Sequence, residues 1–253
     1  MSNYKIYPSL LDKYQRLLDS GKDFESHFNQ DADGNYKRSL EDISQEREQA
    51  LLDAVNRKPH DPIEAADIGT AFNELVDWVI TGNGWEKANV LFAEENGTNY
   101  SFSADLVKKV AEMVRWSAVQ VYVQHDMAVR QGTATLYGYI DYATAPNMLV
   151  DLKTTSSYKA YKYEHGWQRF VYPYCFKAYN YAIYDIDMFR FLVVQLKRPT
   201  KARPYFDGTV YWEDYTCVPK LDEQRLKAMV ESFIDWLETN RSKITDKKIF
   251  AEI

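Results

Sequence analysis

The sequence predicts an α/β fold in which helices flank a central mixed β-sheet, with a helical portion at the N-terminus. Three observations support this class. β-branched and aromatic residues form strand-like runs at 133–142 and 148–154, and a strongly apolar run follows at 188–196. Amphipathic helical patterns precede, separate and follow these runs. A chain of 253 residues can also bury the core of such a domain.

Helical periodicity dominates the first part of the chain. It predicts helices at 9–20, 39–57, 64–81 and 104–118. Ser9 is the expected N-cap of the first helix, and Ser39 with Asp42 three residues later indicates a near capping box at the second. Two prolines close to residue 60 end the second helix. We therefore expect an N-terminal helical region at 1–62 and a core at 63–253.

Strand patterns dominate from residue 119 onward. A strand at 119–130 turns into the 133–142 strand, and a turn of Ala145, Pro146 and Asn147 leads to the strand at 148–154. The remaining elements are a helix from Trp167 to Tyr184, a central strand at 188–196, an amphipathic or edge strand at 209–218 and a long helix at 221–240.

One acidic stretch briefly resembles a calcium-binding loop. Asn29, Asp31, Asp33 and Gly34 stand at the offsets of such a loop, but Leu40 occupies the position of its bidentate glutamate. Asp-Gly is itself a strong turn signal. We therefore expect a polar turn rather than a calcium site.

Composition excludes several classes of protein. The chain has no apolar run long enough for a membrane span, and Met1 to Tyr7 lack a signal-peptide core. Its two distant cysteines suggest no disulfide framework, so we expect a cytoplasmic protein. The net charge is −6, yet residues 153–203 contain ten basic and three acidic residues, a local charge of +7. Such a segment can be a solvated face or a phosphate-contacting surface.

The two strands at 133–142 and 148–154 carry the candidate chemistry. Asp141 and Asp151 would sit among apolar neighbours, where charges are costly unless paired or bound to metal. Their oxygens, with the carbonyl of Leu152, suit Mg²⁺ or Mn²⁺. Lys153 shares a strand face with Asp151 and could orient or deprotonate a water, or steady the charge of a phosphate. The simpler alternative is a surface hairpin with an Asp–Lys ion pair.

These residues resemble the PD-(D/E)xK nuclease superfamily, in which an Asp ends one strand and an acid-x-Lys motif follows on the next. The RecB-like and lambda-exonuclease-like branches also have a Gly shortly before the first Asp, matched here by Gly138. Thr154 and Thr155 match the Thr that follows the Lys. A Q-x-x-x-Y motif on the next helix is matched by Gln168 and Tyr172. The resemblance covers about residues 64–196.

The resemblance implies a restriction-endonuclease-like core and a further metal ligand on the helix at 64–81. RecB-like nucleases have G-T-x-x-H there, with the His facing the metal. This chain keeps Gly69 and Thr70 but has Asn73 in place of the His. An Asn carbonyl oxygen can bind Mg²⁺, and a hydrogen-bonded buried amide is the equal alternative. Asp77, one turn later on the same face, could substitute.

By this resemblance we expect an Mg²⁺- or Mn²⁺-dependent deoxyribonuclease, specifically an exonuclease of phage recombination or repair. Asp141, Asp151 and Lys153 are its expected catalytic residues, with Asp141, Asp151, Leu152 and Asn73 on the metal. Gln168, Tyr172, Thr154 and Thr155 are expected to position DNA. Assembly into a homo-oligomeric ring and a recombination partner protein stay open. The alternative is a non-catalytic nucleic-acid-binding module on a decayed nuclease fold.

Overall fold

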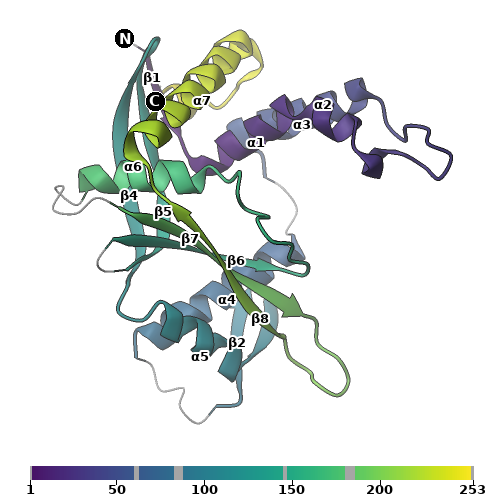
Figure 1. The fold of residues 1–253 in the computed structure, drawn as a ribbon, viewed down its shortest axis with the longest axis vertical. Helices are drawn as coiled ribbons and strands as arrows, with labels where there is room; N and C mark the ends of the chain where they lie inside the picture. Colours follow the sequence, from purple (N-terminus) through teal and green to yellow (C-terminus); the bar gives the residue numbers. More distant parts are fainter. Residues whose placement is uncertain (1, 60–62, 83–87, 145–146, 180–185, 252–253) are drawn as a thin grey trace.

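A six-stranded mixed β-sheet forms the centre of the computed structural model, which describes residues 2–59, 63–82, 88–144, 147–179 and 186–251 (Figure 1). The strand order is β1-β5-β6-β7-β8, and β4 also pairs with β5. β1 runs parallel to β5 and β6 parallel to β7, whereas the other pairs are antiparallel. The strands are β1 (Ser2–Ile6), β4 (Ala118–Val129), β5 (Gly132–Thr144), β6 (Met148–Thr155), β7 (Met188–Lys197) and β8 (Asp207–Thr216).

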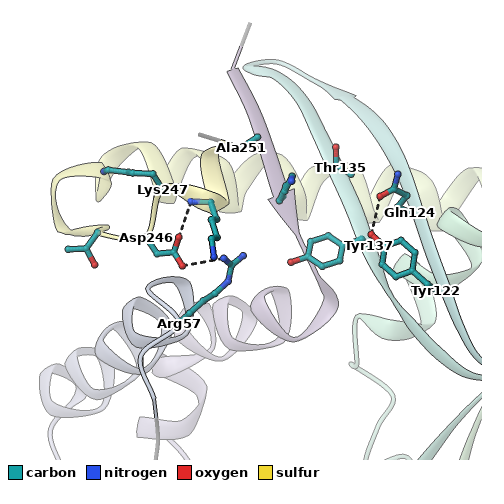
Figure 2. Close-up of a pocket in the computed structure, with 11 residues that line it drawn as sticks. Arg57, Tyr122, Gln124, Thr135, Tyr137, Asp246, Lys247 and Ala251 are labelled. Atoms are coloured by element: carbon teal, nitrogen blue, oxygen red, sulfur yellow. Dashed lines mark hydrogen bonds and ion pairs between the residues drawn. The ribbon is translucent and has the colours of Figure 1, made fainter. Parts of the chain in front are cut away.

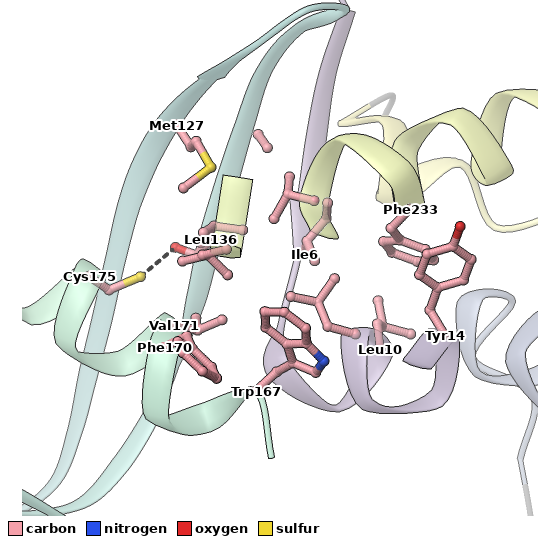
Figure 3. Close-up of a cluster of buried hydrophobic side chains, with 14 of the residues drawn as sticks. Ile6, Leu10, Tyr14, Met127, Leu136, Trp167, Phe170, Val171, Cys175 and Phe233 are labelled. Carbon is pink, nitrogen blue, oxygen red and sulfur yellow. Dashed lines mark hydrogen bonds between the residues drawn. The ribbon is translucent and has the colours of Figure 1, made fainter. Parts of the chain in front are cut away.

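A first helical layer packs against one face of this sheet. Its apolar side chains form one buried cluster with β1, β4, β5 and β7, which includes Leu136 on the sheet and Leu10, Phe170 and Phe233 on the helices (Figure 3). The layer consists of α1 (Pro8–Leu18), α3 (Leu40–Val55), α6 (Gln168–Tyr179) and α7 (Pro219–Thr239). The short helix α2 (Ser20–Phe24) and the 3-10 segments η1 (His27–Asn29), η2 (Arg241–Lys243) and η3 (Lys247–Phe250) complete this part of the chain.

A second layer covers the other face, around β6, β7 and β8. It contains α4 (Glu64–Ile80), α5 (Ala104–Met113) and the hairpin of β2 (Val90–Glu95) and β3 (Thr98–Ser103). Along β6, Leu149 belongs to the first cluster, whereas Val150 and Leu152 belong to the second. Because side chains alternate along a strand, Asp151 and Lys153 face the first layer. The predicted α/β class, a central mixed sheet flanked by helices, is confirmed.

Two strand features escaped the prediction. β1 is a short strand whose Tyr4 and Ile6 enter the first cluster, and five residues offer too little alternation to reveal it. The β2–β3 hairpin turns through Asn96 and Gly97, with φ of 48° and 75°. Asn-Gly is a strong signal for such a turn, so the sequence did contain a cue for this hairpin.

Helix starts were predicted with mixed success. The expected cap at Ser9 is wrong, because α1 begins at Pro8, with Tyr7 in the N-cap position. Proline is favoured at the first helical position, since its fixed φ suits the helix and the amide hydrogen that it lacks would have no acceptor within the helix. The capping box is confirmed: Ser39 accepts from the Asp42 backbone N–H, and the Asp42 carboxylate accepts from that of Ser39.

The N-terminal segment is tied to the sheet and also contains the polar turn. α1 and α3 share the first cluster with α6 and α7, while the division at residue 62 stays a prediction. Asp31 Oδ1 accepts from the backbone N–H groups of Asp33 and Asn35, both at 2.9 Å, as in the polar turn that we favoured. Predictions at residues 60–62, Ala145, Pro146 and the helix end at Tyr184 lie outside the described residues. No described helix is both long and apolar enough to cross a membrane.

Candidate active site

Asp141 and Asp151 lie where β5 and β6 separate. The antiparallel pairing of these strands ends at Tyr142 and Val150, and the two aspartates occupy the next position along each strand. Asp141 Oδ2 accepts a hydrogen bond of 2.8 Å from the backbone N–H of Leu152, across the opening between the strands. The structure therefore brings the two predicted carboxylates to one place, which we call the fork.

A polar cluster surrounds Asp151 on the first-layer side of the fork. Asp151 is 2% exposed, and its Oδ2 lies 2.7 Å from Lys153 Nζ. Its Oδ1 accepts a hydrogen bond of 2.7 Å from Gln168 Nε2, which also lies 3.4 Å from the Tyr172 hydroxyl. Buried charges are stable only when paired or hydrogen-bonded. The D-x-K and Q-x-x-x-Y patterns thus meet at one buried carboxylate.

Gly138 makes room for the Tyr172 ring three residues before Asp141. A methyl group at Gly138 would lie 2.7 Å from Tyr172 Cε1, well inside the normal packing distance of carbon atoms. The absence of a side chain at Gly138 therefore lets α6 approach β5 closely. That approach brings Gln168 within reach of Asp151, which gives the glycine before the first Asp a packing role.

Burial controls the charges at the fork. Desolvation, and then the charge of Asp151, raise the pKa of Asp141 to about 7. Desolvation also raises the pKa of Asp151, although Lys153 opposes it. Desolvation acts to lower the pKa of Lys153, but the attraction of Asp151 and Asp141 outweighs it and the pKa is raised. Lys153 is therefore an ammonium ion at neutral pH, whereas Asp141 changes charge near neutrality.

α4 covers the second-layer side of the fork with residues spaced four apart on one helix face. A methyl group at Gly69 would lie 2.9 Å from Thr154 Oγ1, and two turns later Asp77 Oδ1 accepts a 2.8 Å hydrogen bond from the Tyr142 hydroxyl. Asn73 lies between these two contacts and therefore faces the strands at the fork. Its Oδ1 is buried and accepts no hydrogen bond from any described residue.

The strand on the other side of Asp141 is distorted. β4 pairs with β5 through Val119 and Tyr142, then through Val121 and Ile140, without a pair at Gln120. Gln120 has a φ of 50°, a left-handed conformation that costs a non-glycine residue about 1–3 kcal/mol. Strained backbone concentrates at functional sites. The distortion therefore marks the position facing Asp141 as a place of functional interest.

Thr154 and Thr155 end β6 in different surroundings. Thr154 packs against α4, whereas Thr155 Oγ1 accepts a hydrogen bond of 2.7 Å from Lys162 Nζ. Both threonines thus organise neighbouring parts of the protein, and their contact with DNA stays a prediction. The carbonyl of Leu152 as a metal ligand also stays a prediction; the side chain of this residue is buried in the second cluster.

Two carboxylates that the sequence reasoning missed, the partly buried Asp12 and the buried Glu213, hold the segment between β6 and α6. Asp12 Oδ1, on α1, accepts a 2.8 Å hydrogen bond from the Trp167 backbone N–H, and desolvation raises the pKa of Asp12. Glu213, on β8, accepts from the backbone N–H groups of Lys162 and Tyr163 at 3.0 and 3.3 Å. No local motif marks either residue, because each acts on a segment distant in sequence.

A cavity of about 480 Å³ opens beside Lys153. Residues of α1, β6, β7, α6 and the segment before α6 line it, including Arg16, Lys162 and His165. The Lys153 side chain is 27% exposed, and both Lys153 and Gln168 line this space, so the cluster can be reached from it. The cavity is therefore a route by which an anionic substrate can approach the fork.

Several basic residues of the segment 153–203 are paired with acidic side chains instead of forming a continuous surface of unpaired charge. The Asp151–Lys153 ion pair of the simpler hairpin alternative is present, but it is covered by α6 rather than exposed on a surface. Further along, three arginines already have acidic partners: Arg190 with Asp214, Arg198 with Glu64 and Arg203 with Asp207. Part of the local positive charge is therefore neutralised by acidic side chains of the same protein.

Comparison with known proteins identifies no family for this chain. No family model matches the sequence, and no curated protein matches it. Among solved structures, it is similar to the protein SSO0001, with a TM-score of 0.45 and 13% identity over 92% of this chain and 76% of that chain. It is also similar to a candidate exonuclease from Eubacterium rectale, with a TM-score of 0.42 and 12% identity over 78% of this chain and 75% of that one. Both likenesses are distant.

Proposed function

We propose that this protein is a metal-dependent nuclease that hydrolyses phosphodiester bonds of DNA. The observation that carries the proposal is the pairing of Asp141 and Asp151 at the fork, with Lys153 ion-paired to Asp151 and exposed to a cavity. A surface hairpin has no need to bury one acid fully and a second acid and a lysine in part, since this burial costs free energy. Buried ionisable groups with shifted pKa values are often found at active sites.

The donor atoms at the fork fit Mg²⁺ or Mn²⁺. Among the described residues no three His, Cys, Asp or Glu side chains are grouped to hold a metal ion. Mg²⁺, however, commonly uses one or two carboxylates and keeps several waters. Asp141 and Asp151 would supply the carboxylates, and the unpartnered Oδ1 of Asn73 faces the same strands. An oxygen-only set of this kind suits a hard cation better than zinc.

The protein's own residues would then divide the work of hydrolysis. A bound Mg²⁺ or Mn²⁺ would supply charge stabilisation and a more acidic water. Lys153, as an ammonium ion, donates hydrogen bonds and stabilises the charge of the phosphate; in this state it cannot accept a proton. Gln168 holds the Asp151 carboxylate in one orientation, and Tyr172 packs behind Gln168. Asp12 and Glu213 fix the segment that leads into α6.

DNA is the proposed substrate, and the PD-(D/E)xK resemblance supports this choice. Arg16, Lys162 and Lys153 line the cavity together with the carboxylates of Asp12 and Asp19, so its cations exceed its acids by one. Lysine and arginine side chains are the usual contacts of a phosphate backbone. Exonuclease action in phage recombination, ring assembly and a recombination partner follow from the same resemblance and are part of the proposal.

The direct test is cleavage of linear and covalently closed circular DNA with Mg²⁺, with Mn²⁺ and with a chelator. We expect metal-dependent loss of the linear form, and sparing of the circle if the enzyme works from ends. Lys153→Met should abolish cleavage, whereas Lys109→Met, at an exposed position on α5, should not. The proposal fails if no form of DNA is cut, or if Lys153→Met cuts as well as the parent.

One observation favours the alternative of a non-catalytic DNA-binding module: a third acidic or histidine ligand is not found among the described residues. In that case Asn73 marks the loss of a metal ligand. DNA binding that persists in a chelator, together with no uptake of Mn²⁺ in titration calorimetry, would support the module over the nuclease.

A further inference from the structure

A second, larger cavity of about 720 Å³ lies away from the fork (Figure 2). β1, β4, β5, the end of α3 and residues 245–251 line it. Ile6 and Leu136 face the first layer, so the alternating residues Lys5, Thr135 and Tyr137 face the opposite side of the sheet. None of the predicted active-site residues lines this cavity. It therefore requires its own explanation.

One wall of this cavity is cationic. Lys5, Arg57, Lys247 and Lys248 contribute four positive charges against the single acid Asp246, which leaves a net charge of +3. Arg57 Nη1 lies 3.2 Å from Asp246 Oδ2, and two main-chain carbonyl oxygens accept hydrogen bonds from Lys247 Nζ. Lys5 and Lys248 are exposed and form no ion pair with any described residue. This wall can therefore still bind an anion.

The opposite wall is aromatic. In Figure 2, Tyr122 and Tyr137 lie across from Arg57 and Lys247. The Tyr137 ring is 5.8 Å from that of Tyr7, which fixes its position, and Tyr122 is 42% exposed. The Tyr122 hydroxyl donates to Gln124 Oε1 at 3.0 Å and leaves the amide N–H₂ of Gln124 on the same wall. The wall thus offers ring faces with a polar group beside them.

We propose that this cavity binds a nucleotide, with the phosphate on the cationic wall and the base against the tyrosine wall. Arginine and lysine side chains are the usual phosphate donors, and bases stack on aromatic side chains. A cavity of several hundred Å³ has the size of a small-molecule site. A simple anion would leave the tyrosines unused, and an apolar ligand would leave the lysines unused.

The same phosphate and base are present in a free mononucleotide and in one unit of a DNA strand, so the test must distinguish these two ligands. Binding is measured on the full chain in a chelator by calorimetry, with thymidine 5′-monophosphate, thymidine and an oligothymidylate of about twelve nucleotides. Tight binding of the monophosphate assigns a free-nucleotide site, and binding of the strand alone assigns a strand contact. Cleavage is not measured, so failure of the nuclease proposal leaves this result unaffected.

Four variants separate the two walls from general effects of charge. Lys5→Glu combined with Lys248→Glu should weaken binding about tenfold or more, and Tyr137→Leu about tenfold, while Tyr137→Phe keeps the ring and most of the affinity. Lys220→Glu with Lys227→Glu changes the net charge equally on exposed positions of α7 and should have little effect.

Thermal unfolding of each variant establishes that it is folded. The proposal is overturned if neither nucleotide nor strand binds, if thymidine binds as tightly as its monophosphate, or if the Lys5 and Lys248 variant binds like its α7 control.

Discussion

The two sides of the fork differ in how completely their polar groups are bonded. On the α6 side, Asp151 Oδ1 accepts a hydrogen bond from Gln168, and Oδ2 is ion-paired with Lys153 although it accepts no hydrogen bond. On the α4 side, the buried Oδ1 of Asn73 accepts no hydrogen bond from a described residue, and the pKa of Asp141 is raised to about 7. The buried carboxylate on the α6 side therefore has a hydrogen-bond donor and a counter-charge within the protein, whereas the Asn73 oxygen on the α4 side has neither among the described residues.

This difference is the basis for our proposal of where a cation would bind. A buried polar atom without a partner costs about 1–3 kcal/mol, and the left-handed backbone at Gln120 adds to the strain beside Asp141. We infer that the α6 side holds one carboxylate ready and that the α4 side gains its partners when a cation binds.

The largest expected effect is at Asp151. Asp151→Asn removes the charge that pairs with Lys153 and a proposed metal ligand, so we expect cleavage to fall about a thousandfold. The rate constant under single-turnover conditions measures this loss. Asp105→Asn, at an exposed position on α5, is the control. Activity of Asp151→Asn within tenfold of the parent would contradict the account.

A smaller loss is expected on the α6 side at Gln168. Gln168→Ala removes the 2.7 Å hydrogen bond to Asp151 but no proposed metal ligand, so cleavage should fall about 10–100-fold. The effect should lie in kcat rather than KM, because orientation and not substrate binding is lost. Gln224→Ala, exposed on α7, is the control. An unchanged kcat would remove Gln168 from the site.

Asp141 should make the stability of the protein depend on pH, because burial and the charge of Asp151 raise its pKa. Its raised pKa means that the folded state holds a proton more tightly than the unfolded state, so stability is lost as pH rises from about 4 to about 7. Asp141→Asn keeps an oxygen for the Leu152 N–H and removes the charge. It should raise the free energy of unfolding by up to about 4 kcal/mol at about pH 8, with little gain near pH 4.

Denaturant titration of parent and variant at both pH values measures the difference. An Asp141→Asn variant that is less stable than the parent at the higher pH would show that the ionised carboxylate is well accommodated without metal.

The smallest effect concerns the packing that brings α6 to the fork. Gly138→Ala places a methyl group against the Tyr172 ring and should cost about 1–3 kcal/mol of stability. Removing the ring with Tyr172→Ala should abolish this cost, which a double-mutant cycle measures. Gly21→Ala, where no atom lies within 4 Å, is the control. Equal costs with and without the ring would mean that α6 does not depend on this contact.

The sequence revealed the parts of the fold and the site that depend on local periodicity. Strand alternation placed Asp151 and Lys153 on one face, and helical spacing placed Gln168 and Tyr172 together; the structure brings these four residues to one cluster. Asp12 and Glu213 could not be predicted in this way. Each bonds backbone groups of a distant segment, and such contacts depend on tertiary packing rather than on any local pattern.

Whether the end of a helix could be predicted also depended on whether local or distant contacts fix it. The capping box at Ser39 was predictable because all of its atoms lie within four residues. The start of α1 at Pro8 follows from the β1 strand immediately before it, and β1 is held by its parallel pairing with β5, more than a hundred residues later in the chain. A short strand stabilised by a distant partner leaves little trace in its own sequence.

Calorimetric titration of the full chain with Mn²⁺ tests the central claim most directly. The account predicts that the parent and Asp105→Asn bind the ion, and that Asp141→Asn and Asp151→Asn bind it at least tenfold more weakly. Uptake of Mn²⁺ that is the same in all four proteins, or no uptake by the parent, would contradict a cation site at the fork.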